Sequence, residues 1–284
     1  MKMKRRLLAA ASSAVVALAV AGTASAATVT VTPASLHGWS VVHDTCGAAI
    51  TGSTSFVSGP ATPPAGTGSV QFTVGANGDS YETLRTGQYN ATKLSDLTSL
   101  DYWTYESHFG TGGQAAYLDL RVDWNNDGAQ DDTITFEPIY QTGQGTVTLN
   151  MWQHWSAVDG LWWSDTLGGP PPLFTLATYI ASHPNATILR GSDPNLILAT
   201  GCGRAAWTNF VGNADKLTIN GTTFNFEQTV GPPTTKAQCK MGGWRQFNNP
   251  SFKNQGRCVA YVNHHNGKGK DDDKHKGSGH HKHK

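Results

Sequence analysis

An aspartate-rich segment near the middle of the chain has the residue types and spacing of a calcium-binding loop. Its candidate ligands are Asp123, Asn125, Asp127, Asp131 and Asp132. The first three, followed by Gly128, match the start of the Asp-x-Asp/Asn-x-Asp/Asn-Gly pattern, in which alternate oxygens of a tight turn converge on one hard cation. The last position of a complete EF-hand loop holds Ile134 in place of glutamate, so any site must draw on Asp131, Asp132 or a distant carboxylate. A hairpin loop that binds no metal is the alternative.

Strand geometry groups further polar side chains, because alternate residues of a strand share one face of its sheet. Within residues 115–124, one face carries Tyr117, Asp119, Arg121 and Asp123, and the core face carries Leu118, Leu120 and Val122. The same alternation groups Thr104, Glu106 and His108, and also Thr133, Thr135 and Glu137. If these strands are neighbours, they form a polar sheet surface that suits sugar hydroxyls. A solvated outer face with ion pairs is the alternative.

Four of the nine tryptophans lie in one short stretch, at Trp152, Trp155, Trp162 and Trp163. Exposed indole rings stack against the faces of sugar rings, whereas buried ones pack in the core. Trp162 and Trp163 are consecutive and point to opposite faces of a strand, so we expect one or two of the four to be exposed. The candidate ligand-binding residues are these four tryptophans with Tyr117, Asp119 and Arg121.

Catalytic motifs are absent from the sequence. It contains no Gly-x-Ser-x-Gly, His-Glu-x-x-His or phosphate-binding loop pattern. Carboxylates suited by type to glycoside cleavage are Glu82, Glu106, Asp119, Glu137 and Glu227, but no spacing pairs them. We therefore assign no catalytic residue and expect a binding protein, not an enzyme.

The N-terminus has the form of a secretory signal peptide. Four basic residues precede an apolar run from Leu7 to about Ala21, and small residues end at Ala26. We expect cleavage before Ala27 and an extracellular location. The four cysteines then form two disulfides, and of the three pairings, proximity favours Cys239–Cys258, which leaves Cys46–Cys202.

The remaining chain predicts an all-β fold, a β-sandwich of the jelly-roll type with one short helix. Short alternating segments recur between turns, and Asn220-Gly221 is a strong hairpin signal. A helical pattern follows Pro170-Pro171-Pro172 over residues 173–181. The expected organisation is a signal peptide (1–26), the sandwich (27–228), a Pro/Thr linker (229–238), a small disulfide-stapled module (239–263) and a disordered His/Lys-rich tail (264–284).

Two segments resemble known families. Residues 236–244 and 252–259, with Cys239, Trp244 and Cys258, resemble a short C-terminal module of secreted actinobacterial proteins. Residues 210–219 leading to 224–227 are similar to the final strand pair of concanavalin-like or carbohydrate-module-like jelly rolls. The resemblance implies secretion and a jelly-roll fold.

These patterns together predict a secreted carbohydrate-binding protein with a calcium-stabilised loop. A polysaccharide or cell-wall glycan is the expected partner. Residues 27–263 carry 11 Lys and Arg against 17 Asp and Glu, which argues against nucleic-acid binding, and no later stretch is apolar enough to span a membrane. A glycan-active hydrolase or lyase on the same fold and a cell-surface structural or adhesive protein are the alternatives.

Calcium added to chelator-treated protein is expected to raise its melting temperature, because a ligand that binds only the native state stabilises that state by mass action. Asp127→Ala removes one candidate ligand and should abolish the rise. Melting curves at millimolar calcium measure the effect. An unchanged melting temperature of the wild type would contradict the site.

Overall fold

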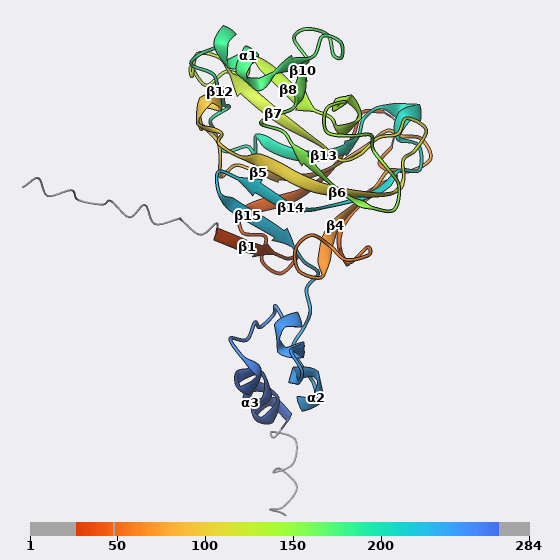
Figure 1. The fold of residues 1–284 in the computed structure, drawn as a ribbon, viewed down its shortest axis with the longest axis vertical. Coiled ribbons are helices and arrows are strands. Elements are labelled where there is room, and N and C mark those ends of the chain that lie inside the picture. Colours follow the sequence, from red (N-terminus) through yellow and green to blue (C-terminus); the bar gives the residue numbers. More distant parts are fainter. Residues whose placement is uncertain (1–26, 48, 267–284) are drawn as a thin grey trace, which may run out of the picture.

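A computed structural model describes residues 27–47 and 49–266, which form a β-sandwich followed by a small helical module (Figure 1). We name the two sheets after their central strands. The β14 sheet contains β1 (Ala27–Val31), β3 (Ser53–Ser58), β4 (Gly68–Thr73), β6 (Leu100–His108), β9 (Trp152–Ser156), β14 (Val211–Ile219) and β15 (Thr222–Phe226). The β7 sheet contains β2 (Trp39–Thr45), β5 (Ser80–Thr86), β7 (Tyr117–Asp123), β8 (Asp132–Phe136), β10 (Leu161–Ser164), β11 (Phe174–Thr175), β12 (Thr187–Ile188) and β13 (Leu196–Gly201).

Neighbouring strands pair antiparallel, except that β1 runs parallel to β15. The order in the β7 sheet is β11-β10-β8-β7-β13-β5-β2, with β12 beside the end of β7. In the other sheet β14 pairs with β6 on one side, and with β4 and then β15 on the other. Asn220 and Gly221 have positive φ and join β14 to β15, which confirms the predicted hairpin. The two sheets support the β-sandwich prediction, and the jelly-roll connection stays a prediction.

A single hydrophobic cluster takes side chains from both sheets and forms the core of the sandwich. The predicted core face of β7 is confirmed, because Leu118, Leu120 and Val122 are fully buried. Phe72 and Leu217 enter the same cluster from the β14 sheet. Truncating one such leucine to alanine costs about 2–5 kcal/mol, so these contacts fix the position of β7 strongly.

The predicted helix is present but shorter than expected. Helix α1 (Leu176–Ser182) is capped by the Thr175 hydroxyl, which accepts a hydrogen bond from the Thr178 N–H, and it buries Leu176 and Tyr179. It starts later than residue 173 because Phe174–Thr175 pairs with β10 as β11. The helix therefore lies at the end of the β7 sheet beside β10 and β12 (Figure 1).

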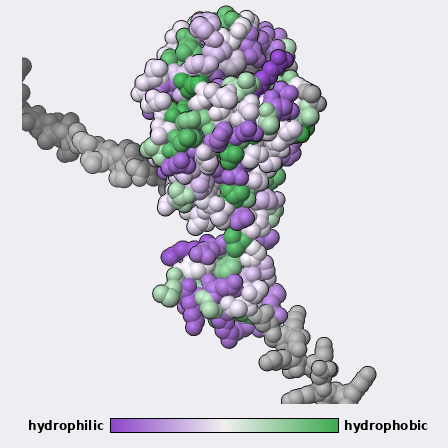
Figure 2. All heavy atoms as spheres, turned by 90° about the vertical axis from the view of Figure 1, so that its right-hand side faces the viewer, coloured by the Kyte–Doolittle hydropathy of each residue, from purple (hydrophilic) through white to green (hydrophobic). Residues whose placement is uncertain are grey.

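The C-terminal module has a hydrophobic cluster of its own, built on Cys239, Phe247, Cys258 and Val262. It contains α2 (Lys236–Cys239) and α3 (Gln255–Asn266), joined by the Cys239–Cys258 disulfide. The other disulfide, Cys46–Cys202, lies in the sandwich, so both expected pairs are present. Figure 2 shows a largely hydrophilic module surface and scattered apolar groups on the sandwich.

Two predicted boundaries are wrong. The linker 229–238 ends inside α2, which begins at Lys236 after a capping box of Thr235 and Gln238, and the tail predicted from residue 264 begins inside α3. The predicted signal peptide and the remainder of the tail lie outside the described residues. Within the described chain, no helix has both the length and the apolar character needed to cross a membrane.

Candidate functional site

A cleft of about 540 Å³ opens on the outer face of the β7 sheet. Its principal lining residues are Tyr81, Tyr117, Asp119, Thr135, Glu137 and Trp163. The cleft therefore combines carboxyl, hydroxyl and aromatic groups on a face whose reverse side is core.

Strand register brings the central residues of the cleft into one row. Trp163 on β10 is opposite Thr135 on β8, and Thr135 is opposite Asp119 on β7. Glu137 lies two residues beyond Thr135 and so points to the same face. Diagonal neighbours of this kind in an antiparallel pair are about 7–8 Å apart, which places the carboxyl groups of Asp119 and Glu137 on one small area of the sheet.

Asp119 is buried under two neutral hydrogen-bond donors. Thr135 Oγ1 donates to Oδ1 at 2.6 Å, and the Tyr81 hydroxyl donates to Oδ2 at 2.8 Å. Burial raises the pKa of Asp119 to about 6, although both hydrogen bonds favour the carboxylate. Burial, and then the charge of Asp119, raise the pKa of Tyr81 well above its ordinary value, so the phenol remains a donor.

Glu137 is the second acid of the cleft. The indole Nε1 of Trp163 donates to Glu137 Oε2 at 3.3 Å, which fixes the indole beside the carboxyl group. Burial raises the pKa of Glu137 to about 7, and the nearby charge of Asp119 adds to the shift. The cleft thus holds two carboxyl groups whose pKa values lie close to neutral pH.

Several predicted ligand-binding residues meet in this cleft, and others do not. Tyr117, Asp119 and Trp163 line it, whereas Arg121 is half-buried on the same face of β7 outside it. Trp152 is half-buried on β9 in the other sheet, packs against Tyr105 and donates to the Pro60 carbonyl.

The assignment of the other two tryptophans to a ligand is wrong. Trp155 and Trp162 are fully buried, and their indole N–H groups bond to Thr104 Oγ1 and to the Ala157 carbonyl inside the protein. Both rings therefore belong to the core, where a ligand cannot reach them.

The proposed polar surface also included β6, and that part of the prediction is wrong. β6 pairs with β14 and β9 in the other sheet, so Thr104 and Glu106 face the core. Burial raises the pKa of Glu106 to about 8, which keeps this carboxyl group neutral at pH 7. The other grouping is confirmed, because β8 lies beside β7 and Thr133, Thr135 and Glu137 line the cleft.

The predicted calcium ligands form a loop closed by internal hydrogen bonds. The buried Asp123 carboxylate accepts from the backbone N–H groups of Asn125, Asp127 and Gly128. Asp131 accepts from the Trp124 N–H, and Asp132 points into the protein toward Ser164 and Tyr179. In the part of the chain that the structure describes, no group of three His, Cys, Asp or Glu side chains has the arrangement of a metal site. Calcium binding here stays a prediction.

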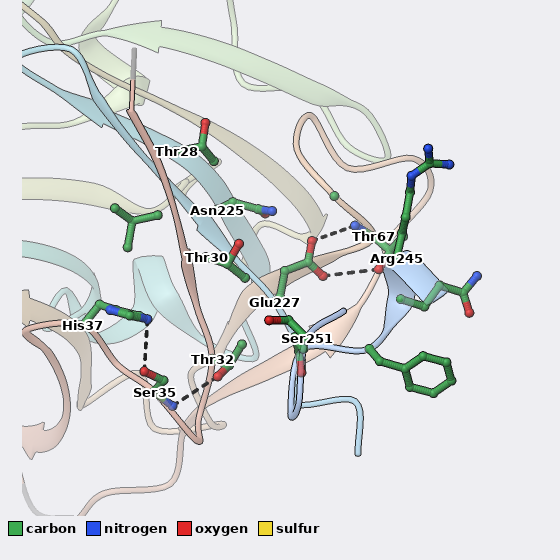
Figure 3. Close-up of a pocket in the computed structure, with 15 residues that line it drawn as sticks. Thr28, Thr30, Thr32, Ser35, His37, Thr67, Asn225, Glu227, Arg245 and Ser251 are labelled. Atoms are coloured by element: carbon green, nitrogen blue, oxygen red, sulfur yellow. Dashed lines mark hydrogen bonds between the residues drawn. The ribbon is translucent and has the colours of Figure 1, made fainter. Parts of the chain in front are cut away.

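A second cavity, of about 740 Å³, lies between β1, the end of β15 and the C-terminal module (Figure 3). Glu227 accepts hydrogen bonds from the Thr67 N–H and hydroxyl, and Asn225 and Arg245 face the same space. The side chains of Thr28 and Thr30 add hydroxyl groups from the edge strand. This groove is polar but lacks an exposed indole or phenol ring for a sugar to stack on, so we place the candidate site in the cleft of the β7 sheet.

Sequence reasoning missed Tyr81, Tyr140 and Asp165. Tyr81 lies on β5, and the sequence does not say which strands flank it. Tyr140 belongs to a turn after β8, and Asp165 directly follows β10. The alternation of Tyr81, Thr83 and Arg85 is the signal that would have placed Tyr81 on an outer face.

Comparison of the chain with protein-family models, with curated proteins and with solved structures gave no match.

Raising the pH from about 5 to about 8 is expected to lower the free energy of unfolding, and Glu137→Gln should reduce that loss by up to about 3 kcal/mol. The native state holds a proton on Glu137 up to a pKa of about 7, whereas an unfolded glutamate releases it near 4.5. The stabilisation is therefore complete below the unfolded pKa and is lost as the pH rises through the folded one.

Urea unfolding at stepwise pH measures this dependence. Asp96→Asn, which removes an exposed carboxyl group, controls for the change in net charge. A Glu137→Gln variant with the pH dependence of the wild type would show that Glu137 is ionised across the whole range.

Proposed function

We propose that the protein binds a carbohydrate chain in the cleft of the β7 sheet. The observation that carries the proposal is the half-exposed Trp163 ring, held by Glu137 beside the row of Thr135 and Asp119. An indole face stacks on the apolar face of a sugar ring, and polar groups around it fix the hydroxyls. A polysaccharide or cell-wall glycan is the partner class that fits this combination.

Hydrogen-bonding capacity in the cleft supports the same conclusion. Asp119 and Glu137 use some of their lone pairs on Tyr81, Thr135 and Trp163, and both residues line the cleft. Hydroxyl groups both donate and accept, so a sugar can pair with carboxylates and with threonine hydroxyls in turn. Tyr140 adds a further half-exposed phenol at the rim.

We also propose that the protein is secreted and that its strands are connected as in a jelly roll. Two disulfides within the described chain are compatible with an oxidising, extracellular location, as the signal-like N-terminal sequence predicts. A calcium ion bound at the loop of Asp123 and Asp127 would stabilise the end of the sheet next to the cleft.

Trp163→Ala is expected to weaken polysaccharide binding by about 1–3 kcal/mol and leave folding intact, because the ring is half-exposed and acts as an aromatic anchor. Trp152→Ala, a half-buried tryptophan on the other sheet, is the matched control and should retain wild-type affinity. A glycan array followed by titration of tryptophan fluorescence measures both. Equal affinity of Trp163→Ala and wild type would refute the cleft as the binding site.

The two carboxyl groups favour a second candidate, a glycan-cleaving enzyme on the same cleft. Asp119 and Glu137 are diagonal neighbours on one face of the β7–β8 pair, and glycosidases use two carboxyl groups about 5–9.5 Å apart. In this candidate, Glu137 with its higher pKa donates a proton to the leaving oxygen, and Asp119 with its lower pKa takes a proton from the water that attacks the sugar carbon.

Cleavage would require protonated Glu137 and ionised Asp119, so activity should peak between about pH 6 and about pH 7. Reducing-end release from a polysaccharide that binds the cleft is the measurement. Glu137→Gln should abolish release but retain binding. Binding by the wild type with no release at any pH would exclude the enzyme and leave the binding function.

A further inference from the structure

A third cavity, of about 330 Å³, lies at the end of the β7 sheet under α1, apart from the carbohydrate cleft. Four aromatic rings line it, from Trp124, Phe174, Tyr179 and His183. The exposed Leu167 forms part of its rim, and its exposed wall is mostly ring and aliphatic carbon.

The rings are held in fixed positions. Trp124 stacks on His183 with centroids 4.3 Å apart, and Phe174 stacks on Tyr179 at 5.2 Å. The Trp124 indole N–H also donates to the Tyr179 hydroxyl at 2.7 Å. The pocket is therefore preorganised, and a ligand that enters it orders few side chains.

A buried carboxylate lies in the wall of this pocket. Asp132 is 3% exposed and accepts hydrogen bonds from Ser164 Oγ, Thr166 Oγ1 and the Tyr179 hydroxyl. All three donors are neutral, and no ion pair within residues 27–47 and 49–266 includes Asp132. Asp131 and Asp165 are its sequence and spatial neighbours, and burial followed by the charge of Asp132 raises the pKa of Asp165. Three acidic side chains therefore lie in or near the wall of the pocket.

The polar groups around Asp132 are already paired with one another. The Tyr179 hydroxyl donates to Asp132 and accepts from Trp124, while Ser164 and Thr166 donate to Asp132. A sugar would find few free donors or acceptors here, in contrast to the cleft. A ligand that needs only aromatic rings and a nearby carboxylate, and no hydrogen bonds, fits best.

We propose that this pocket binds a quaternary ammonium group carried on a small organic molecule. Such a cation is apolar on its surface, makes no conventional hydrogen bonds and is attracted both by the faces of aromatic rings and by a nearby carboxylate. The proposal is independent of carbohydrate binding, since the two sites use different side chains of the β8–β10 pair.

Titration of the full chain with choline chloride at constant chloride tests the proposal, because Trp124 in the pocket reports binding by its fluorescence. The neutral isostere 3,3-dimethylbutan-1-ol has the same shape without the charge. Choline is expected to bind saturably, and the isostere at least about tenfold more weakly, since it lacks the cation–π and carboxylate attraction.

Phe174→Leu keeps an apolar side chain but removes one ring, and Asp132→Asn removes the charge; each should weaken choline binding at least about tenfold. Phe174 is half-exposed, so its variant remains informative if the buried Asp132→Asn protein fails to fold. Trp152→Phe, on the other sheet, is the control and should bind choline as the wild type does.

Three results would overturn the proposal. Equal affinity for choline and its isostere would show an apolar pocket with no preference for charge. Wild-type choline affinity in Phe174→Leu would place binding elsewhere on the protein, and the absence of a saturable signal at tens of millimolar would exclude the site.

Discussion

The strict alternation of β7 at the centre of its sheet is the constraint on which the rest of the structure depends. Leu118, Leu120 and Val122 are fully buried between the sheets, so the register of this strand cannot change without moving them to solvent. A slip of one residue would carry Asp119 into the core in place of a leucine. The packing of three apolar side chains therefore determines which face presents Tyr117 and Asp119, and through pairing with β8 and β10 it also fixes Thr135 and Trp163.

Several buried carboxyl groups of the sandwich are surrounded by neutral donors in place of cations. Asp119 bonds to a threonine and a tyrosine, and Asp215 bonds to the backbone N–H groups of Ala65 and Phe226. Burial raises the pKa of Asp215 to about 7, close to the value for Glu137. Such groups lose their proton near neutral pH at a cost in stability. Asp119 and Glu137 also line an open cleft, so we interpret these two carboxyl groups as functional. For Glu106, which lines no described cavity, we have no such interpretation.

Local sequence patterns predicted the strands in which polar and apolar residues alternate. They did not predict the strands whose burial depends on which other strands pack against them. Two-residue alternation found β7 and the Asn220-Gly221 hairpin because these signals lie within one segment. At the start of β14 alternation alone is uninformative, since Asn213 and Asp215 look like loop residues until Ser69 and the Phe226 N–H become their buried partners. The choice between Trp162 and Trp163 needed the same information, because alternation says that the two rings point apart and only the other sheet says which of them is inside. Which strands become neighbours is set by long-range packing, and one sequence does not reveal it.

The two faces of the β8–β10 pair line two different cavities, the aromatic pocket and the cleft. Asp132 and Ser164 point inward to the aromatic pocket, while their neighbours Thr133 and Asp165 point outward to the cleft. Both faces carry a carboxylate and a hydroxyl, so composition alone does not separate them. The two faces differ in hydrogen bonding. On the inward face the Ser164 hydroxyl already donates to Asp132, whereas on the outward face the carboxyl groups of the cleft have lone pairs that a ligand can use. Because a saturated polar group offers only its charge, whereas an unsaturated one offers a directed bond, the inward face suits the cation that we propose and the outward face suits the hydroxyl-rich chain that we propose.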